Sequence, residues 1–124
     1  MLRSMFQIYI KDSIEAVEFY QKAFDAKLVA WDKNEDGSYM HAELDIFGQI
    51  LALSEALPEA GERNSGNTMQ LCLHLGAGNE EIVKKAYEVL KEGAQIHTPL
   101  GEMFFSPLMF GLIDKFKVNW CVFI

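Results

Sequence analysis

Residues 6–28 read FQIYIKDSIEAVEFYQKAFDAKL and predict an alternating strand, a short polar break and one amphipathic helix. Apolar residues occupy every second position of Phe6–Ile10, so one face of this strand is apolar and is expected to meet the helix. Apolar residues then recur at helical spacing along Ile14–Phe24. Asp12 or Ser13 is the expected N-cap, because either side chain can accept hydrogen bonds from the free amides of the first turn.

The same plan returns at residues 69–94 (MQLCLHLGAGNEEIVKKAYEVLKEGA), and about three short β-rich runs follow each copy. Residues 56–67 (ALPEAGERNSGN) are rich in Pro, Gly and Asn and poor in apolar residues, which is typical of a linker. We therefore predict an α+β fold in a single domain, residues 1–124. Its two βαβββ modules, at about 1–55 and 68–124, should form a cupped eight-stranded mixed sheet with the helices outside.

Short β-rich runs mark the strands that follow the second helix. They are Gln95–Thr98, Glu102–Phe105, Met109–Ile113 and Lys117–Ile124. Pro99–Gly101 is expected to be a turn between the first two runs, which makes His97 a turn residue.

The composition argues against several classes of partner. Half of the 124 residues are hydrophobic, which is enough to bury a core. A net charge of -7 and a pI near 4.9 disfavour nucleic acid and anionic membrane surfaces, and no apolar run approaches the ~18 residues of a membrane span. The first residues lack a signal-peptide pattern, and two cysteines are too few for a disulfide scaffold, so we expect a cytoplasmic protein.

Several motifs occur together along the chain. They are IEAVEFYQKAF (14–24), MHAEL (40–44), ILALSE (50–55), PLGEMFF (99–105) and DKFKVNW (114–120). In this order they resemble the PhnB-like branch of the vicinal oxygen chelate superfamily, which includes glyoxalases, bleomycin-resistance proteins and extradiol dioxygenases. The resemblance implies paired βαβββ modules, a homodimer and a cavity inside each cup. Asp25 and Lys117 stand where the family usually has Gly, and these departures concern local turn geometry.

The resemblance also implies four positions at which metal-using relatives hold a divalent ion through His, Gln or Glu. These positions fall at Met5, Ala52, Gln70 and Asn119, and a register change of two residues would replace Met5 by Gln7. A thioether, a methyl group and neutral amides supply no negative charge and no imidazole, which such ions require. We therefore predict that the inherited metal site is absent and that no cofactor is held there.

A second set of residues suits a ligand cavity. Gln7, Tyr9, Gln70 and Asn119 are polar and lie on strand faces opposite the helix-packing stripe. Neutral donors and acceptors of this kind fit an uncharged or zwitterionic small molecule. An equally compatible interpretation is that these side chains are core polar groups hydrogen-bonded to one another.

The remaining histidines and acids have two interpretations each. His41 and Glu43 share one face of a strand and could form an acid–base pair or a weak metal pair, or they could belong to a solvent-facing edge or a dimer contact. His41 is included among the candidate ligand-binding residues because it lies in the MHAEL motif. His74 lies on the polar face of its strand, where a structural role and a functional one are equally compatible.

The two cysteines follow Gln70 and Asn119 at the same interval. If these two residues occupy equivalent positions on neighbouring parallel strands, Cys72 and Cys121 lie two residues further along on the same face and close together. We expect two reduced, buried thiols, because free cysteine is commonly buried.

Three functions fit the sequence. The first is a homodimer that binds a small organic molecule in its cup without the usual divalent metal. The alternative is a metal-dependent lyase, isomerase or dioxygenase whose ligands, drawn from His41, Glu43 and His74, have moved from the usual positions. The third is a structural or regulatory partner that uses the fold only to dimerise.

Overall fold

Alternating and helical hydrophobic patterns produce eight strands, two α-helices and one short 3-10 helix in the computed structural model, which describes residues 1–124. The chain comprises two compact units, Met1–Asn64 and Ser65–Ile124, and the boundary falls within the predicted linker at 56–67. Each unit has the βαβββ order, which confirms the predicted fold class, and the eight strands are arranged as two four-stranded sheets, one in each unit.

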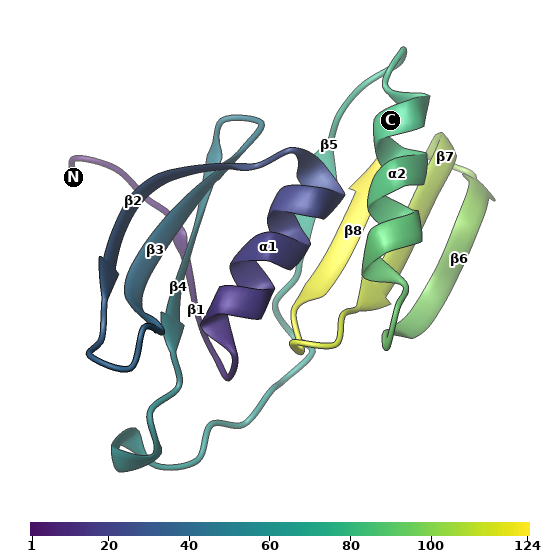
Figure 1. Ribbon diagram of the computed structural model, residues 1–124. Helices are drawn as coiled ribbons and strands as arrows, with labels where there is room; N and C mark the ends of the chain where they lie inside the picture. Colours follow the sequence, from purple (N-terminus) through teal and green to yellow (C-terminus); the bar gives the residue numbers. More distant parts are fainter. The chain divides into compact units, whose positions relative to one another are not determined.

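The first unit contains one helix and four strands (Figure 1). Its elements are β1 (Phe6–Ile10), α1 (Ser13–Phe24), β2 (Lys27–Lys33), β3 (Tyr39–Ile46), β4 (Gln49–Glu55) and the 3-10 helix η1 (Pro58–Ala60). The strand order is β1-β4-β3-β2, with β1 parallel to β4 and the other pairs antiparallel.

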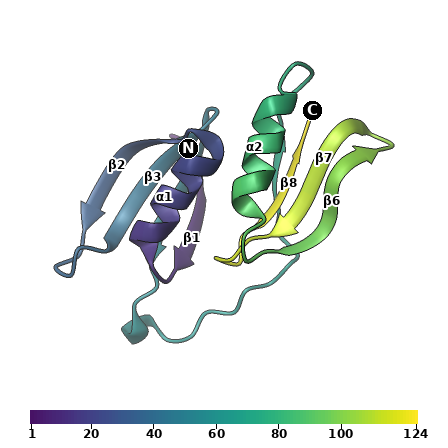
Figure 2. The ribbon, with the colours of Figure 1, turned by 45° about the vertical axis from the view of Figure 1, so that its right-hand side comes forward.

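The second unit repeats this arrangement (Figure 2). Its elements are β5 (Leu71–His74), α2 (Glu80–Leu90), β6 (Gln95–Met103), β7 (Ser106–Ile113) and β8 (Asn119–Phe123). The order β5-β8-β7-β6 again places the first and last strands side by side and parallel. Neither helix is long and apolar enough to cross a membrane.

Each sheet buries the face that meets its own helix. In the first unit Leu51 and Leu53 of β4 are fully buried, and Glu55 on the same face contacts the start of α1. In the second unit Phe110 of β7 lies 5.2 Å from the Tyr87 ring of α2. Because side chains alternate along a strand, the residues between these positions occupy the opposite face of each sheet. We call the opposite face of the sheet in the first unit the first open face, and the opposite face of the sheet in the second unit the second open face.

The start of α1 is capped by a side chain from another strand. Asp12 is the N-cap residue, but its side chain makes no capping hydrogen bond. The Glu55 carboxylate instead accepts hydrogen bonds from the backbone amides of Asp12 and Ser13 and from the Ser13 hydroxyl, at 3.0, 2.9 and 2.8 Å. A carboxylate at the positive end of a helix is electrostatically favourable, so this contact ties α1 to the end of β4.

One predicted turn is wrong. Pro99–Gly101 lies inside the continuous strand β6, and the chain reverses instead at Phe104–Phe105. The pairing of β6 with β7 contains register shifts around this segment. Pro is compatible with β6 because this strand is at the edge of the sheet, where a residue without an amide hydrogen is tolerated.

Asp25 and Lys117, the two departures from the family pattern, both adopt the left-handed conformation. Their φ angles are 51° and 72°. This region costs little for Gly and more for other residues. The turn geometry is therefore retained although the glycines are replaced.

Candidate functional site

Strand register places the candidate residues on the open faces. On the first open face Gln7 lies opposite Ala52 and Tyr9 lies opposite Ser54, across the parallel β1–β4 pair. On the second open face the parallel β5–β8 pair places Cys72 opposite Cys121 and His74 opposite Phe123. These pairings define which polar groups can act together within each unit.

Neutral polar side chains meet at one end of the second open face. Gln70 Nε2 donates to Asn119 Oδ1 at 3.2 Å, and His97 Nε2 lies 3.2 Å from the same oxygen. Because a carbonyl oxygen only accepts, His97 Nε2 carries the hydrogen of this bond, and His97 Nδ1 lies 3.2 Å from the Thr98 hydroxyl oxygen. Asn119 Nδ2 donates to the Asn67 carbonyl at 3.5 Å. We call Gln70, His97 and Asn119 the amide–imidazole cluster.

The place of His97 corrects the prediction that it is a turn residue. Its ring lies on the second open face directly above Gly111 of β7, where an added Cβ would be 2.4 Å from His97 Cε1. Gly111 is the register partner of Cys121, so the imidazole occupies the place that a side chain at 111 would fill. A glycine inside a strand often marks a place where another group approaches the backbone closely. Gly111 was therefore the sequence signal that a side chain such as His97 lies over β7.

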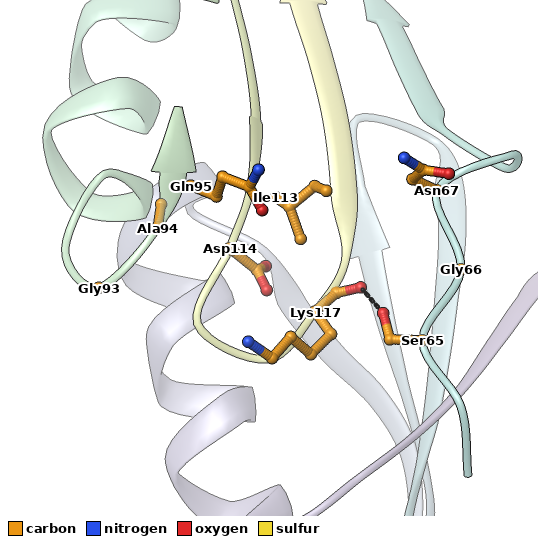
Figure 3. Close-up of a pocket in the computed structure, with 9 residues that line it drawn as sticks. All are labelled: Ser65, Gly66, Asn67, Gly93, Ala94, Gln95, Ile113, Asp114 and Lys117. Atoms are coloured by element: carbon orange, nitrogen blue, oxygen red, sulfur yellow. Dashed lines mark hydrogen bonds between the residues drawn. The ribbon is translucent and has the colours of Figure 1, made fainter. Parts of the chain in front are cut away.

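A pocket of about 560 Å³ lies within the second unit (Figure 3), and none of the three cluster residues is among those that line it. The segment before β5 forms one side, and the α2–β6 and β7–β8 connections form the other. The lining residues are Ser65, Gly66, Asn67, Gly93, Ala94, Gln95, Ile113, Asp114 and Lys117. Two of them reach the cluster, because Asn67 accepts from Asn119 and Ile113 is the register partner of Asn119.

The buried carboxylate of this pocket has structural partners. Asp114 is 1% exposed, and its carboxylate accepts from the amides of Phe116 and Val118 and from Trp120 Nε1, at 2.8, 3.0 and 2.9 Å. The Lys117 carbonyl accepts from the Ser65 hydroxyl at 3.2 Å, which joins the two sides of the pocket. The Asp114 charge is therefore used to hold the β7–β8 turn, and it is not directed to a ligand.

The two cysteines are neighbours, as the sequence suggested. The expectation that both are buried is wrong, because Cys72 is exposed while Cys121 is 9% exposed. Burial, and then the proximity of Cys72, raise the pKa of Cys121 to about 11. Beyond the cysteines, the His74 ring stacks on Phe123 at 4.4 Å, and Phe105 meets Phe123 edge-on at 5.5 Å. The thiols therefore lie between a polar cluster and an aromatic one.

The first open face carries other predicted residues. Gln7 Nε2 donates to the Ser54 hydroxyl at 3.0 Å and to the Ile8 carbonyl at 3.1 Å. Tyr9 remains 46% exposed, and the Arg63 guanidinium lies 3.7 Å above its ring. These contacts orient both side chains while leaving the Tyr9 hydroxyl accessible.

His41 and Glu43 also lie on the first open face and contact each other, with His41 Nε2 3.2 Å from Glu43 Oε1. Glu43 is 5% exposed, so the interpretation of a solvent-facing edge is wrong for this residue. Two hydrogen bonds from the Arg3 guanidinium, at 2.9 and 2.7 Å, cover the carboxylate. The Arg3 hydrogen bonds, followed by the one from His41, lower the pKa of Glu43 to about 2. Arg3 was not identified from the sequence.

The residues at the inherited metal positions do not fit a divalent ion. The register places Gln7, and not Met5, opposite Ala52, so the first unit offers one amide and one methyl group. Gln70 and Asn119 in the second unit are hydrogen-bonded to each other. No group of three or more His, Cys, Asp or Glu side chains is arranged to hold a metal. Function without a metal at these positions stays a prediction.

The chain has two βαβββ units. In each unit a helix covers one face of the sheet, and candidate site residues lie on the other face. This is the paired-module class of protein that the sequence motifs predicted. The model of the Glyoxalase/Bleomycin resistance protein/Dioxygenase superfamily matches residues 4–122. The chain belongs to this superfamily. The resemblance to vicinal oxygen chelate proteins is thereby confirmed.

Similar proteins extend over almost the whole chain. The uncharacterized proteins Mb0911c of Mycobacterium bovis and Rv0887c of Mycobacterium tuberculosis are each 26% identical over 118 residues. These matches cover 91% of this chain and 76% and 68% of the two relatives. The relatives support the family assignment without indicating a substrate.

Solved structures confirm the fold. Protein PA1353 from Pseudomonas aeruginosa has a TM-score of 0.82 at 20% identity and covers 99% of this chain and 97% of its own. The PhnB protein from Bacillus cereus has a TM-score of 0.79 at 22% identity, with 98% of both chains covered. The fosfomycin resistance protein FosX from Listeria monocytogenes has a TM-score of 0.70 at 14% identity and covers 98% of this chain and 91% of its own. At these identities the likeness establishes architecture alone.

Replacing Glu43 by Gln is expected to remove an acid-dependent part of the stability. Arg3 and His41 lower the Glu43 pKa from 4.5 to about 2, so the unfolded chain takes up this proton at a higher pH than the folded one. The contribution is present above pH 4.5 and is lost as the pH falls toward 2. Thermal unfolding midpoints measured from pH 6 to about pH 2 should show a wild-type advantage over Glu43→Gln that shrinks across this window. Glu62→Gln, at an exposed position, is the control, and a wild-type advantage over Glu43→Gln that is independent of pH would contradict this account.

Gly111→Ala is expected to displace the His97 ring, because the new Cβ would lie 2.4 Å from His97 Cε1. The His97–Asn119 hydrogen bond should be lost at a cost of about 1 kcal/mol, since the ring can move away. NMR of the His97 imidazole and urea unfolding measure both effects. Gly101→Ala is the matched control, because the atom nearest to its new Cβ is 3.9 Å away and its φ is not in the left-handed region. Unchanged His97 resonances in Gly111→Ala would show that the ring does not lie above residue 111.

Proposed function

We propose that this protein binds a small, uncharged or zwitterionic organic molecule without the divalent metal site of its metal-using relatives. The observation that carries the proposal is the amide–imidazole cluster at the border of the 560 Å³ pocket in the second unit. Pockets of about 300–1,000 Å³ with a few oriented polar groups are typical of small-molecule sites. The proposed ligand contacts in this unit are Gln70 and Asn119.

The hydrogen bonds of the cluster leave Gln70 available to a ligand. Asn119 Oδ1 accepts from Gln70 and from His97, and Asn119 Nδ2 donates to Asn67. Asn119 therefore orients the Gln70 amide, whose Oε1 and second amide hydrogen remain for another partner. An adjacent donor and acceptor can pair with an amide or hydroxyl group of an uncharged molecule, or with the polar groups of a zwitterion that has no net charge.

The proposal extends to the first open face through Gln7, Tyr9 and His41. Gln7 is held by Ser54, and the exposed Tyr9 ring is held by Arg63, so both polar groups are oriented and accessible. His41 is oriented by Glu43, whose charge is compensated by Arg3. These groups give the first open face its own set of polar contacts for the same class of ligand.

We further propose that the protein is cytoplasmic, as the few cysteines suggest, and that it is a homodimer, as the family resemblance implies. Native mass spectrometry tests the homodimer together with the metal content. Protein purified without chelator or nickel resin should give twice the 14.1 kDa chain mass, and replacing His41, Glu43 or His74 by Ala should not change its content of divalent ions. A monomer would refute the dimer. One ion per chain that is lost in these variants would instead favour the alternative, a metal-dependent lyase, isomerase or dioxygenase.

A thermal-shift screen of small amides, alcohols and zwitterionic amino-acid-like compounds tests the binding proposal. A ligand present at about 100 times its Kd should stabilise the protein by about 2.7 kcal/mol. Gln70→Ala should weaken binding of such a hit about tenfold, as the loss of one good hydrogen bond predicts. Gln49→Ala is the matched control, because the Gln49 amide bonds the Ile50 carbonyl in the first sheet. No hit, or equal weakening by both variants, would count against the proposed site.

A further inference from the structure

We infer that Cys72 and Cys121 form a two-thiol site for one thiophilic divalent cation of the zinc and cadmium kind. The two residues are register partners on parallel strands, and both lie on the second open face. Cys72 is exposed, so an ion can reach the pair from solvent. The inference is independent of the small-molecule ligand proposed above.

Strand spacing suits a bridging ion better than a disulfide. Neighbouring strands lie ~4.8 Å apart, and the Cβ atoms of register partners that point the same way are separated by about that distance. An unstrained disulfide brings its Cβ atoms to ~3.8 Å, so closing one here would pull the strands together. Two thiolates that each bind a tetrahedral ion at ~2.3 Å have sulfur atoms ~3.8 Å apart, which two cysteine side chains can reach by rotation about χ1.

An imidazole lies on the same row of the sheet. Gly111 is the next register position after Cys121, and the His97 ring lies above it. The Cys72 and Cys121 side chains and the ring of His97, which comes from β6, therefore occupy successive positions over β5, β8 and β7. These residue types are the ligands of structural zinc sites. His97 is now hydrogen-bonded to Asn119, and the three groups do not yet converge. A cation bound by the thiols can recruit His97 in exchange for that hydrogen bond, with water completing the shell.

This site differs in position and chemistry from the inherited one. The inherited positions in this unit are Gln70 and Asn119, and the cysteines lie two residues further along each strand. Each thiol loses one proton to solvent as it binds, so one M²⁺ and two R–SH give M(SR)₂ and two H⁺. Burial raises the pKa of Cys121, which opposes this loss of a proton, so only ions that bind thiolate strongly should fill the site. Magnesium and calcium prefer oxygen ligands and should not compete.

Titration of the reduced chain with Cd²⁺ tests the inference. We expect one ion per chain, a thiolate-to-cadmium charge-transfer band in the near ultraviolet and release of two protons per ion. Cys72→Ser and Cys121→Ser should each weaken cadmium binding at least about tenfold. Removing a group that only hydrogen-bonds to a metal ligand already lowers metal affinity by about that factor, so loss of a direct ligand should cost no less. His97→Gln should weaken binding less, and Asp32→Asn, at an exposed position of the first unit, is the control that should leave it unchanged.

The inference is overturned if no charge-transfer band appears, if the band persists in both cysteine variants, or if binding releases no protons. Circular dichroism checks the fold of Cys121→Ser, and alkylation of the exposed Cys72 in the wild-type chain provides a second test that needs no substitution. An ion that copurifies with the protein and is lost in Cys72→Ser supports this site and leaves the proposed small-molecule function intact. An ion that depends on His41 instead belongs to the metal-dependent alternative.

Discussion

Parallel pairing between the first and last strands of each unit is the constraint on which the rest of the structure depends. It joins β1 to β4 and β5 to β8, strands that are separated in the chain by a helix and two further strands. The register is held by one buried face, where Leu51 and Leu53, or Trp120 and Val122, lie beneath the helix. Burial of each such side chain contributes roughly 1.5–3 kcal/mol, and a slip of one residue would turn that face to the outside. The neighbours on the open faces follow from this register.

The same constraint explains why much of the architecture was predictable. Period-two and period-3.6 patterns identify β1, α1 and β4 closely, because apolar residues recur in each at the spacing of the face that packs within its unit. The proximity of Cys72 and Cys121 also followed from the pattern, since equal steps along two parallel strands preserve register. What could be predicted of the candidate site is the part that regular strands position.

Contacts made outside the periodic pattern could not be predicted. Arg3 precedes β1 and reaches Glu43 forty positions away, and no local signal couples the two. Pro99 and Gly101 give a strong turn signal, which concealed the edge strand that brings His97 over the second open face. The pocket is lined largely by connections between elements, where apolar periodicity is absent. In each case tertiary context outweighed local propensity.

The two open faces differ in whether they carry a charged side chain, although the two sheets have the same topology. On the first open face the Glu43 carboxylate is nearly buried and is ion-paired with Arg3. Binding a metal would require breaking this ion pair, so Glu43 is a poor metal ligand. On the second, amides and an imidazole satisfy one another, and the neighbouring thiol of Cys121 is kept protonated by burial. A neutral face needs no counter-charge when it is empty, and it stays neutral when one divalent ion replaces two thiol protons. The fold therefore sets which positions face one another, while the donor type at each position determines the ligand that can bind there.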